Sequence, residues 1–517
     1  MTEPIQNPWR FAEISEPRGL HVPKPCAVQR RSAPLRPTGA RPTGLCAAAL
    51  RLAVLGLAAL CVAGLWAAGR ADLAIADSQG SSNPASHDAP AQLEAPPGWS
   101  TASPRPEMSP RFWVERPESP ETSPKTVADA VPGPGAEPGS GSATDLGPFG
   151  LAMAGAGSES VDGRWIHTQD VAGEKCYAFF ARAHTKAVAE PERSILARIV
   201  WLDAKGAQVE QPDYPPSRPV QGSRDSWILE GAYRAPARAA RAQIELHLRW
   251  TPDGQVIWWG PSLREARAPP PRKVRLASVN HRPRGGTPMA NVERFAALVG
   301  EAARQKADAV CLPEGITVVG TGKSYADVAE PVPGPSTEAL SKAAAQHGIH
   351  VFAGLYEREG AAIHNTCIVL GRDGKLIGKY RKVCIPREEI DGGIAPGDEY
   401  PVFDLDFGRV GMMICWDVHF PEVARELGRK GAEVIFLPIW GGNKTLAQAR
   451  AIENQIFLVT SGYDFETSIF DRTGLEMAKA ERDPEVIVVE VDLNERQLWP
   501  WLGDWRSRIW REAPSRR

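Results

Sequence analysis

Strict alternation of apolar and polar residues marks the middle of the chain. In the segment QIELHLRW, residues 243–250, Ile, Leu and Leu alternate with Gln, Glu, His and Arg, which places the apolar side chains on one face of an extended strand. Similar short runs rich in aromatic and β-branched residues lie between Gly, Pro and Asp turns, and they read RWIHT, KCYAFFARAHT, SILARIVWLD, DSWILEGAYRA and QVIWWGPSLREA. This spacing of strands predicts an antiparallel β-sandwich over residues 158–267.

The predicted sandwich resembles the jelly-roll modules of carbohydrate-binding type, which makes a glycan one expected partner. A spacer or dimerisation domain without a ligand is the equally open alternative, because a fold does not by itself imply a function. The tryptophans of these runs are expected in the sandwich core rather than on a sugar-binding surface, and they are Trp165, Trp227, Trp258 and Trp259.

After a proline-rich linker, ARAPPPRK at residues 266–273, the period of the apolar positions changes. Residues 291–307, NVERFAALVGEAARQKA, carry apolar residues at helical spacing, and residues 336–348 predict a second helix capped by Ser336 and stopped by Gly348. Apolar strand-like runs lie around these helices, namely KVRLASVN, DAVCLPE, IHVFAGLYE, NTCIVLGRDGKLIGKYRK, GRVGMMIC, AEVIFLPIW, FLVTSGYD and VIVVEVD. Alternation of this kind predicts an α/β domain with buried sheets over residues 273–517.

The first 69 residues have a different pattern again. Residues 1–44 are basic and proline-rich, and are predicted to be disordered, whereas residues 52–69 form an uncharged run just long enough to span a bilayer. Because the positive charge lies upstream, a transmembrane helix or signal anchor within residues 45–69 would keep the N-terminus inside and place the rest of the chain outside the cytoplasmic membrane. A cleaved signal, which would make the protein secreted, and a start codon assigned too early are the alternatives.

Residues 70–157 are rich in Ser, Pro, Ala, Gly and Glu, and many of the 47 prolines of the chain lie before residue 150. Such a segment has few large apolar groups whose burial could offset the entropy lost on ordering. We therefore predict a disordered linker over residues 70–157, semi-stiff where proline is dense.

Composition and charge exclude several classes of function. The chain has 60 Lys and Arg against 62 Asp and Glu, and no tract of interleaved basic and aromatic residues, so nucleic acid is not an expected partner. None of its eight cysteines forms a CxxC pair or a Cys/His cluster with zinc spacing, so neither a metal nor another cofactor is predicted. Free and mostly buried thiols are expected instead.

Three predicted strands end in reactive side chains. DAVCLPE ends at Glu314, Lys382 follows KLIGKYR, and GMMIC ends at Cys415. A carboxylate, an ammonium and a thiol are the groups that amide hydrolysis through a thioester requires, because the carboxylate accepts the thiol proton and the ammonium stabilises the oxyanion. The spacing alone does not bring the three residues together, since each type is also common on surfaces or in cores.

The residues after Cys415 predict a bend from strand to helix. Pro421 suits a first helical turn, apolar residues at 420, 423, 424 and 427 form a helical stripe, and Gly431 ends it. The thiol is then expected near a helix N-terminus, whose dipole favours the thiolate.

From about residue 273 to residue 492 the chain resembles the nitrilase superfamily of carbon–nitrogen hydrolases. The motifs that carry this resemblance follow one another in the family's order, and they are ADAVCLPEG, AAQHGIHVFAGLYE, HNTCIVLGRDGKLIGKYRKV, APGDEYPVFDLDFGRVGMMICWDVHFPEVARELGRKGAEVIFLPIWGG, ARAIENQIFLVTSG and SIFDRTG. The resemblance implies an αββα four-layer sandwich in a homodimer, and a catalytic triad of Glu314, Lys382 and Cys415.

The resemblance also implies a second glutamate soon after the lysine. Glu389 matches it best, and its neighbour Glu388 is the alternative. Its implied role is to position the substrate and to tune Lys382. One departure from the family's pattern is Cys384, which stands where many members have histidine.

The motif CWDVHFPE resembles the amidase and N-carbamoyl-amine hydrolase branches, which implies hydrolysis of a small linear amide or N-carbamoyl amine through a thioester. The expected substrate-binding residues are Trp416, Asp417, His419 and Trp440. Two other functions remain open, an extracytoplasmic acyltransferase of the same superfamily and a non-enzymatic glycan-binding protein. The tryptophan-rich C-terminal segment, residues 496–514, is expected to pack on the domain or on a partner subunit.

Overall fold

The computed structural model describes residues 95–116 and 149–514. The predicted basic N-terminus (1–44), the predicted membrane span (45–69) and part of the predicted linker lie outside these residues. Within residues 95–116 and 149–514, no helix combines the length and the apolar composition needed to cross a membrane.

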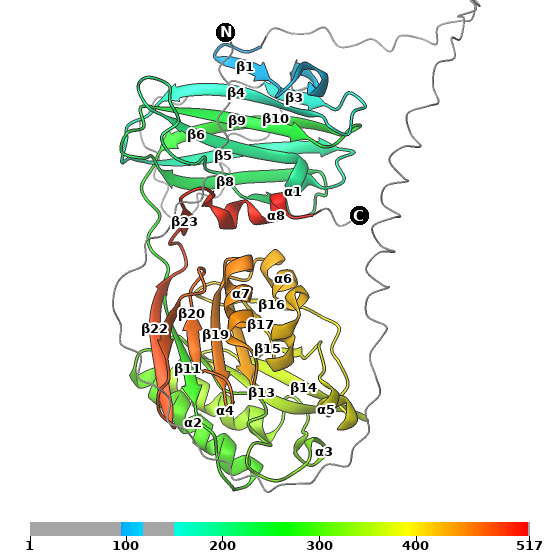
Figure 1. Cartoon of the computed structure of the whole chain (residues 1–517), viewed down its shortest axis with the longest axis vertical. Helices are drawn as coiled ribbons and strands as arrows, with labels where there is room; N and C mark the ends of the chain where they lie inside the picture. Colours follow the sequence, from blue (N-terminus) through cyan, green and yellow to red (C-terminus); the bar gives the residue numbers. More distant parts are fainter. Residues whose placement is uncertain (1–94, 117–148, 515–517) are drawn as a thin grey trace, which may run out of the picture. The chain divides into compact units, whose positions relative to one another are not determined.

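The described residues of the ranges 99–116 and 149–265 form two antiparallel sheets, with the strand orders β1-β4-β9-β6 and β2-β3-β10-β5-β8-β7 (Figure 1). Every run that the alternation pattern singled out is a strand. The elements are β1 (Trp99–Ala102), η1 (Pro106–Met108), β2 (Arg111–Glu115), β3 (Gly150–Ala154), β4 (Asp162–Asp170), β5 (Cys176–Lys186), α1 (Pro191–Ser194), β6 (Ile195–Leu202), β7 (Ser217–Pro219), β8 (Ser226–Arg234), β9 (Arg241–Arg249) and β10 (Gln255–Glu265).

The two sheets share one apolar core, as expected for a β-sandwich. Its side chains come from both sheets and include Trp165, Ile244, Leu246, Phe179, Val256 and Trp258. Trp165, Trp227 and Trp258 are buried as predicted, and Trp259 is half-buried.

The prediction of a disordered linker over residues 70–157 is wrong for part of that range. Strands β1 and β3 pair with β4 and β10, and β2 pairs with β3. Trp99 and Val114 enter the core, and all five residues of β3 are buried. These strands have only four or five residues each. Their few apolar side chains therefore do not stand out in the average composition of the surrounding Pro- and Ser-rich segment.

Two residues on the polar face of β9, Glu245 and His247, are buried rather than exposed to water. Glu245 is 1% exposed and pairs with Arg198 and His247, and Arg164 lies 3.5 Å from its carboxylate. Burial by itself would raise the pKa of Glu245, but the hydrogen bond from His247 and the two arginine charges outweigh it and bring the pKa down to about 2. The alternation therefore predicted the faces of the strand correctly but not their solvent exposure.

The second domain has two mixed six-stranded sheets. The first has the order β15-β14-β13-β12-β11-β22 and the second has the order β16-β17-β18-β19-β20-β21. The first sheet consists of β11 (Lys273–Asn280), β12 (Ala309–Cys311), β13 (His350–Glu359), β14 (Ala362–Leu370), β15 (Leu376–Arg381) and β22 (Glu485–Asp492). The second consists of β16 (Val402–Asp404), β17 (Arg409–Met412), β18 (Val434–Ile439), β19 (Phe457–Gly462), β20 (Ser468–Phe470) and β21 (Glu476–Lys479).

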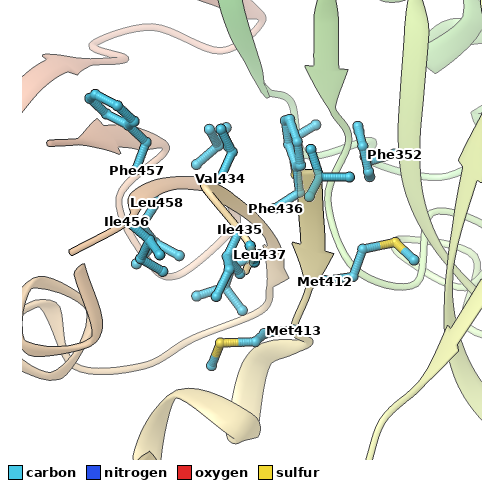
Figure 2. Packing of buried hydrophobic residues seen from close by; sticks show 14 of the residues in the cluster. Phe352, Met412, Met413, Val434, Ile435, Phe436, Leu437, Ile456, Phe457 and Leu458 are labelled. Carbon is cyan, nitrogen blue, oxygen red and sulfur yellow. The ribbon is translucent and has the colours of Figure 1, made fainter. Parts of the chain in front are cut away.

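Helices cover the outer face of each sheet, which gives the predicted four-layer αββα arrangement (Figure 1). Helices α2 (Pro288–Arg304) and α4 (Pro335–His347) pack on the first sheet, and α6 (Pro421–Arg429) and α7 (Lys444–Asn454) pack on the second. The inner faces of the sheets meet in an apolar core, where the rings of Phe352 and Phe436 stack with centroids 3.7 Å apart (Figure 2). Stacked sheets buried on both faces explain the nearly continuous apolar strands.

The helix boundaries follow local capping chemistry. Thr287 caps α2 by accepting a hydrogen bond from the N–H of Ala290, and Gly348 ends α4 with a left-handed φ of 63°. The predicted N-cap of α4 is wrong by two positions, because the helix begins at Pro335 and Gly334 occupies the cap. Ser336 instead donates its hydroxyl hydrogen to Glu330 at 3.0 Å.

The C-terminal segment consists of β23 (Leu498–Trp499), β24 (Gly503–Asp504), η4 (Trp505–Ser507) and α8 (Ile509–Glu512). It packs against the rest of the chain, as predicted. The guanidinium groups of Arg425 and Arg429 on α6 lie over the ring of Trp510, at 5.5 and 5.4 Å. Arg511 donates a hydrogen bond to the carbonyl oxygen of Pro215.

Candidate active site

Glu314 follows β12 in a loop that is held against β13. The N–H of Gly354 donates to the carbonyl of Pro313 at 3.2 Å, and the N–H of Ile316 donates to the carbonyl of Gly354 at 3.0 Å. A Cβ at position 354 would lie 2.7 Å from the Cα of Glu314, so this close approach requires glycine. Backbone contact between the loop and the strand therefore positions Glu314, whose side chain is 2% exposed.

Lys382 comes directly after β15, and its backbone is still hydrogen-bonded to β14. Its N–H donates to the carbonyl of Asn365 at 2.8 Å. Its ammonium donates to Oε1 of Glu314 at 3.1 Å and to Oε2 of Glu389 at 2.9 Å. Burial would lower the pKa of Lys382, but the charges of Glu314, Cys415 and Glu389 together raise it above its ordinary value, so the side chain stays an ammonium.

Glu389 lies on the short helix α5 (Arg387–Asp391) and is 5% exposed, whereas its neighbour Glu388 is exposed to solvent. Only Glu389 therefore faces Lys382. Its Oε1 also accepts from the amide of Asn365 at 2.6 Å and from the hydroxyl of Tyr356 at 3.4 Å. Burial and the neighbouring charge of Glu314 raise the pKa of Glu389.

Cys415 lies at a bend between a strand and a helix. Strand β17 ends at Met412, and the 3-10 helix η3 (Cys415–His419) begins at the cysteine itself. The φ of Cys415 is 44°, in the left-handed region that L-residues seldom adopt. A strained turn of this kind presents a nucleophile at the top of a sheet. The Sγ atom lies 3.5 Å from the carbonyl oxygen of Gly441, beyond the end of β18.

The thiol of Cys415 is held in its neutral form. Burial raises its pKa to about 12, the charge of Glu314 adds to the increase, and the Lys382 ammonium opposes it. The expectation that a helix dipole favours the thiolate is wrong, because the 3-10 turn separates Cys415 from the start of α6 at Pro421. At neutral pH the thiol therefore needs a base before it can attack a carbonyl carbon.

Alkylation of Cys415 without substrate should accordingly be slow at pH 7 and rise about tenfold per pH unit up to pH 10, because the thiolate fraction rises in that proportion below the pKa. Mass spectrometry of the iodoacetamide-labelled peptide measures this rate. The half-buried Cys384, whose pKa burial also raises to about 12, serves as an internal comparison. Fast labelling of Cys415 that levels off above pH 7 would show a lowered pKa and contradict this account.

The structure brings together the four residues expected to be catalytic, because Lys382 contacts both glutamates and the charges of Glu314 and Lys382 act on Cys415. Sequence reasoning missed Asn365, which contacts both carboxylates from β14. Asn365 stands inside an apolar strand, and only the pairing of β14 with β13 and β15 reveals its neighbours.

Three hydrogen bonds hold the side chain of Asp417 in place, and its role in substrate binding stays a prediction. The residue is fully buried, and its carboxylate accepts hydrogen bonds from the Tyr380 hydroxyl at 2.7 Å, the Cys384 N–H at 2.9 Å and the Ile414 N–H at 2.8 Å. The 3-10 turn directs this side chain inward, away from solvent. Asp417 therefore fixes the bend that carries Cys415.

Trp416 and His419, also expected to bind substrate, lie on the surface of the same turn. Trp416 is 37% exposed, and its ring lies over the ring of His419 with centroids 4.2 Å apart. Trp440 follows β18 and is half-buried against Tyr463, with ring centroids 4.9 Å apart. Arg282 lies over both of these rings and pairs with Asp464.

Comparison with known proteins links this geometry to a family. The model of the carbon-nitrogen hydrolase family matches residues 275–500. The omega-amidase NIT2 of Xenopus tropicalis is 31% identical over 245 residues, which cover 42% of this chain and 87% of that protein. The human omega-amidase NIT2 is 29% identical over 250 residues, which cover 43% of this chain and 91% of that protein. The match to the family model falls on the second domain.

Solved structures also resemble part of the chain. Nit3 of Saccharomyces cerevisiae, described as a member of branch 10 of the nitrilase superfamily, is 26% identical, with a TM-score of 0.39, and covers 43% of this chain and 90% of its own. An amidase from Nesterenkonia sp. is 23% identical, with a TM-score of 0.38, and covers 43% of this chain and 93% of its own.

Proposed function

The chain belongs to the carbon-nitrogen hydrolase family, and from that membership we propose that it hydrolyses a small linear amide or N-carbamoyl amine through a covalent intermediate on Cys415. The observation that carries this proposal is the convergence of Glu314, Lys382 and Glu389 on a neutral thiol at a strained turn. The similarity of the chain to amidases supports the choice of an amide.

In the first half of the proposed reaction, Glu314 accepts the proton of the Cys415 thiol as the sulfur attacks the carbonyl carbon of the substrate. Forming a free thiolate at pH 7 from a thiol with a pKa of about 12 would cost on the order of 7 kcal/mol, and transfer to an adjacent carboxylate avoids that cost. The ammonium of Lys382 stabilises the negative oxygen of the tetrahedral intermediate.

The intermediate collapses when the carbon–nitrogen bond breaks and Glu314 returns its proton to the leaving nitrogen. Ammonia or an amine departs, and a thioester or a carbamoyl-enzyme remains on the sulfur. Water then enters, loses a proton to Glu314 and attacks the same carbon. The carbon–sulfur bond breaks, the sulfur recovers its proton from Glu314, and the acid leaves.

The two buried residues Glu314 and Lys382 have different roles in this cycle. Glu314 has to change its protonation state, whereas Lys382 has to remain charged throughout. The contacts fit this division, because two carboxylates hold the ammonium of Lys382 and raise its pKa, while Oε2 of Glu314 has no hydrogen-bond partner among the described residues.

A screen for ammonia release tests the proposal. The full chain and its Cys415→Ala variant are incubated with short amides, N-carbamoyl amines, ureides and nitriles, and release is expected from an amide or a carbamoyl compound with the unsubstituted chain alone. Release of ammonia by both proteins, or from nitriles alone, would overturn the proposal. Adding an amine acceptor separates hydrolysis from acyl transfer, because an acyltransferase would form the new amide in place of the acid.

A soluble version of the protein should begin before β1, at about residue 95. Strand β1 pairs with β4, and β2 pairs with β3, so a chain that starts at residue 150 would leave both sheets of the sandwich incomplete.

The homodimer, the membrane anchor with an extracytoplasmic catalytic domain, and a glycan ligand of the sandwich stay predictions. For the sandwich, a glycan array probed with the full chain is the direct measurement.

A further inference from the structure

Asn365 is the residue of β14 that contacts all the charged groups beside the nucleophile. It is fully buried, and it lies opposite Tyr356 of β13 in the strand register. Its Nδ2 donates to Oε1 of Glu314 at 2.7 Å and to Oε1 of Glu389 at 2.6 Å. Its carbonyl oxygen accepts the N–H of Lys382 at 2.8 Å. One asparagine therefore holds two carboxylates through its side chain and the lysine through its backbone.

The surrounding charges determine which way the amide of Asn365 points. The Nδ2 atom carries two hydrogens, and each is directed at a carboxylate oxygen. The reverse orientation would place the amide oxygen against two negative groups, so it is excluded by repulsion. In the observed orientation Oδ1 is buried without a hydrogen-bond partner among the residues that the structure describes. The cost of this unsatisfied oxygen is offset by the two charge-assisted hydrogen bonds that Nδ2 donates to the carboxylates.

These contacts make the two oxygens of Glu314 unequal. Oε1 accepts from Asn365 at 2.7 Å and from the ammonium of Lys382 at 3.1 Å, so its lone pairs are engaged. Oε2 is buried, and no described residue forms a hydrogen bond with it. It is therefore the oxygen with lone pairs free to accept a proton.

Glu389 has no such free oxygen. Its Oε2 accepts from Lys382 at 2.9 Å, and its Oε1 accepts from Asn365 and from the hydroxyl of Tyr356. The two glutamates share one ammonium and one amide, yet only Glu314 keeps an oxygen for chemistry. The amide of Asn365 also lies between two like charges that would otherwise repel each other and favour uptake of a proton.

We propose that Asn365 is a positioning residue, which orients Glu314 so that Oε2 faces the Cys415 thiol as the base, and which stabilises the negative charge of both carboxylates through its two hydrogen bonds. This proposal rests on the proposed function, because it concerns the proton that leaves Sγ when the carbon–sulfur bond forms. Asn365 acts through Glu314, because its side-chain amide donates its hydrogen bonds to the two glutamates.

The tyrosines near Glu314 do not titrate in the pH range in which the acid limb of kcat/KM would be measured. The charge of Glu314 acts on three tyrosines, and burial raises the pKa of each above the ordinary value; they are Tyr325, Tyr356 and Tyr463. All three stay neutral in the acidic and neutral range. An acid limb in the pH profile therefore reports on the pair of Glu314 and Glu389 with Lys382 charged.

The test compares the pH profiles of kcat/KM for the full chain and its Asn365→Ala variant on one amide substrate. Without the amide donor the carboxylates hold a proton to higher pH, so the acid limb should move up by about one pH unit. At the optimum, kcat should fall about 100-fold with KM changed less than threefold. The Asn365→Ser variant keeps one donor, so its kcat and its acid limb should lie between those of the unsubstituted chain and those of the alanine variant. It replaces the alanine variant if that variant does not fold.

Asn454→Ala is the matched control. Asn454 is a buried asparagine of α7 whose Nδ2 donates to a backbone carbonyl at 3.0 Å and whose Oδ1 is also without a partner. This variant should lose thermal stability and keep the pH profile of the unsubstituted chain. A change at Asn365 that leaves the acid limb in place, or that raises KM at constant kcat, overturns the proposal. Failure of the unsubstituted chain to release ammonia from any amide would instead refute the proposed function.

Discussion

Replacing Cys415 by alanine should reduce kcat by at least about 10⁴-fold while the protein stays folded. Removal of the nucleophile abolishes the covalent route, and what remains is the smaller contribution of binding and oxyanion stabilisation. The thiol contributes little to folding, because a thiol is a weak hydrogen-bonding group and its Sγ lies 3.5 Å from the carbonyl oxygen of Gly441. Ammonia release with a saturating amide measures the loss, and thermal unfolding checks the fold.

Cys367→Ala is the matched control for this experiment. Cys367 is a fully buried free thiol on β14, within the apolar core between the two sheets. Loss of its sulfur should cost about 1 kcal/mol of unfolding free energy and leave kcat within about threefold. An alanine variant of Cys415 that still released ammonia from amides at the original rate would refute the thioester mechanism.

Much of the site could be predicted because its reactive residues follow strands that the apolar runs in the sequence identify. The apolar runs before Glu314, Lys382 and Cys415 mark three strand ends, and the ends of strands in α/β sheets lie where sites form. The order of the motifs then related the three residues to one another. The choice between Glu388 and Glu389 needed the structure, since neighbouring residues on α5 point in different directions and only one is buried.

Other parts of the molecule were hidden from the sequence for physical reasons. Asn365 reaches the carboxylates through strand register, which connects positions about 20 to 50 residues apart in the sequence. Asp417 follows the nucleophile closely, but the direction of a side chain in a 3-10 turn depends on the backbone that surrounds it. The pKa of Cys415 is set chiefly by burial, a property of the packed domain, and so the dipole argument predicted the wrong direction.

Replacing Lys382 by methionine should have the second large effect, on both activity and stability. The change removes the ammonium that is expected to stabilise the oxyanion, so kcat should fall about 10³-fold. It also leaves Glu314 and Glu389, both at most 5% exposed, with no ammonium between them. Removing one partner of a buried ion pair costs about 3–5 kcal/mol of unfolding free energy.

The destabilisation of the methionine variant should depend on pH in a defined direction. Without the ammonium, the carboxyl pair takes up a proton at a higher pH in the folded state than in the unfolded chain. The folded state then binds more protons between the ordinary glutamate pKa near 4.3 and the raised value, so stability increases as the pH falls through that window. The variant should therefore be closer in melting temperature to the unsubstituted chain at pH 5.5 than at pH 8.

Lys379→Met provides the control, because Lys379 also pairs with a buried glutamate, Glu357, but at a distance from the thiol. Arg381 donates to the same carboxylate at 2.8 Å, so Glu357 keeps a cationic partner when Lys379 is lost. This variant should lose about 1 kcal/mol or less and retain its activity. In the unsubstituted chain, the raised pKa of Lys382 means that its contribution to stability is complete at neutral pH and disappears only as the pH rises above about 10. Equal melting temperatures of the Lys382 and Lys379 variants at pH 8 would show that the ammonium does not compensate the two buried carboxylates.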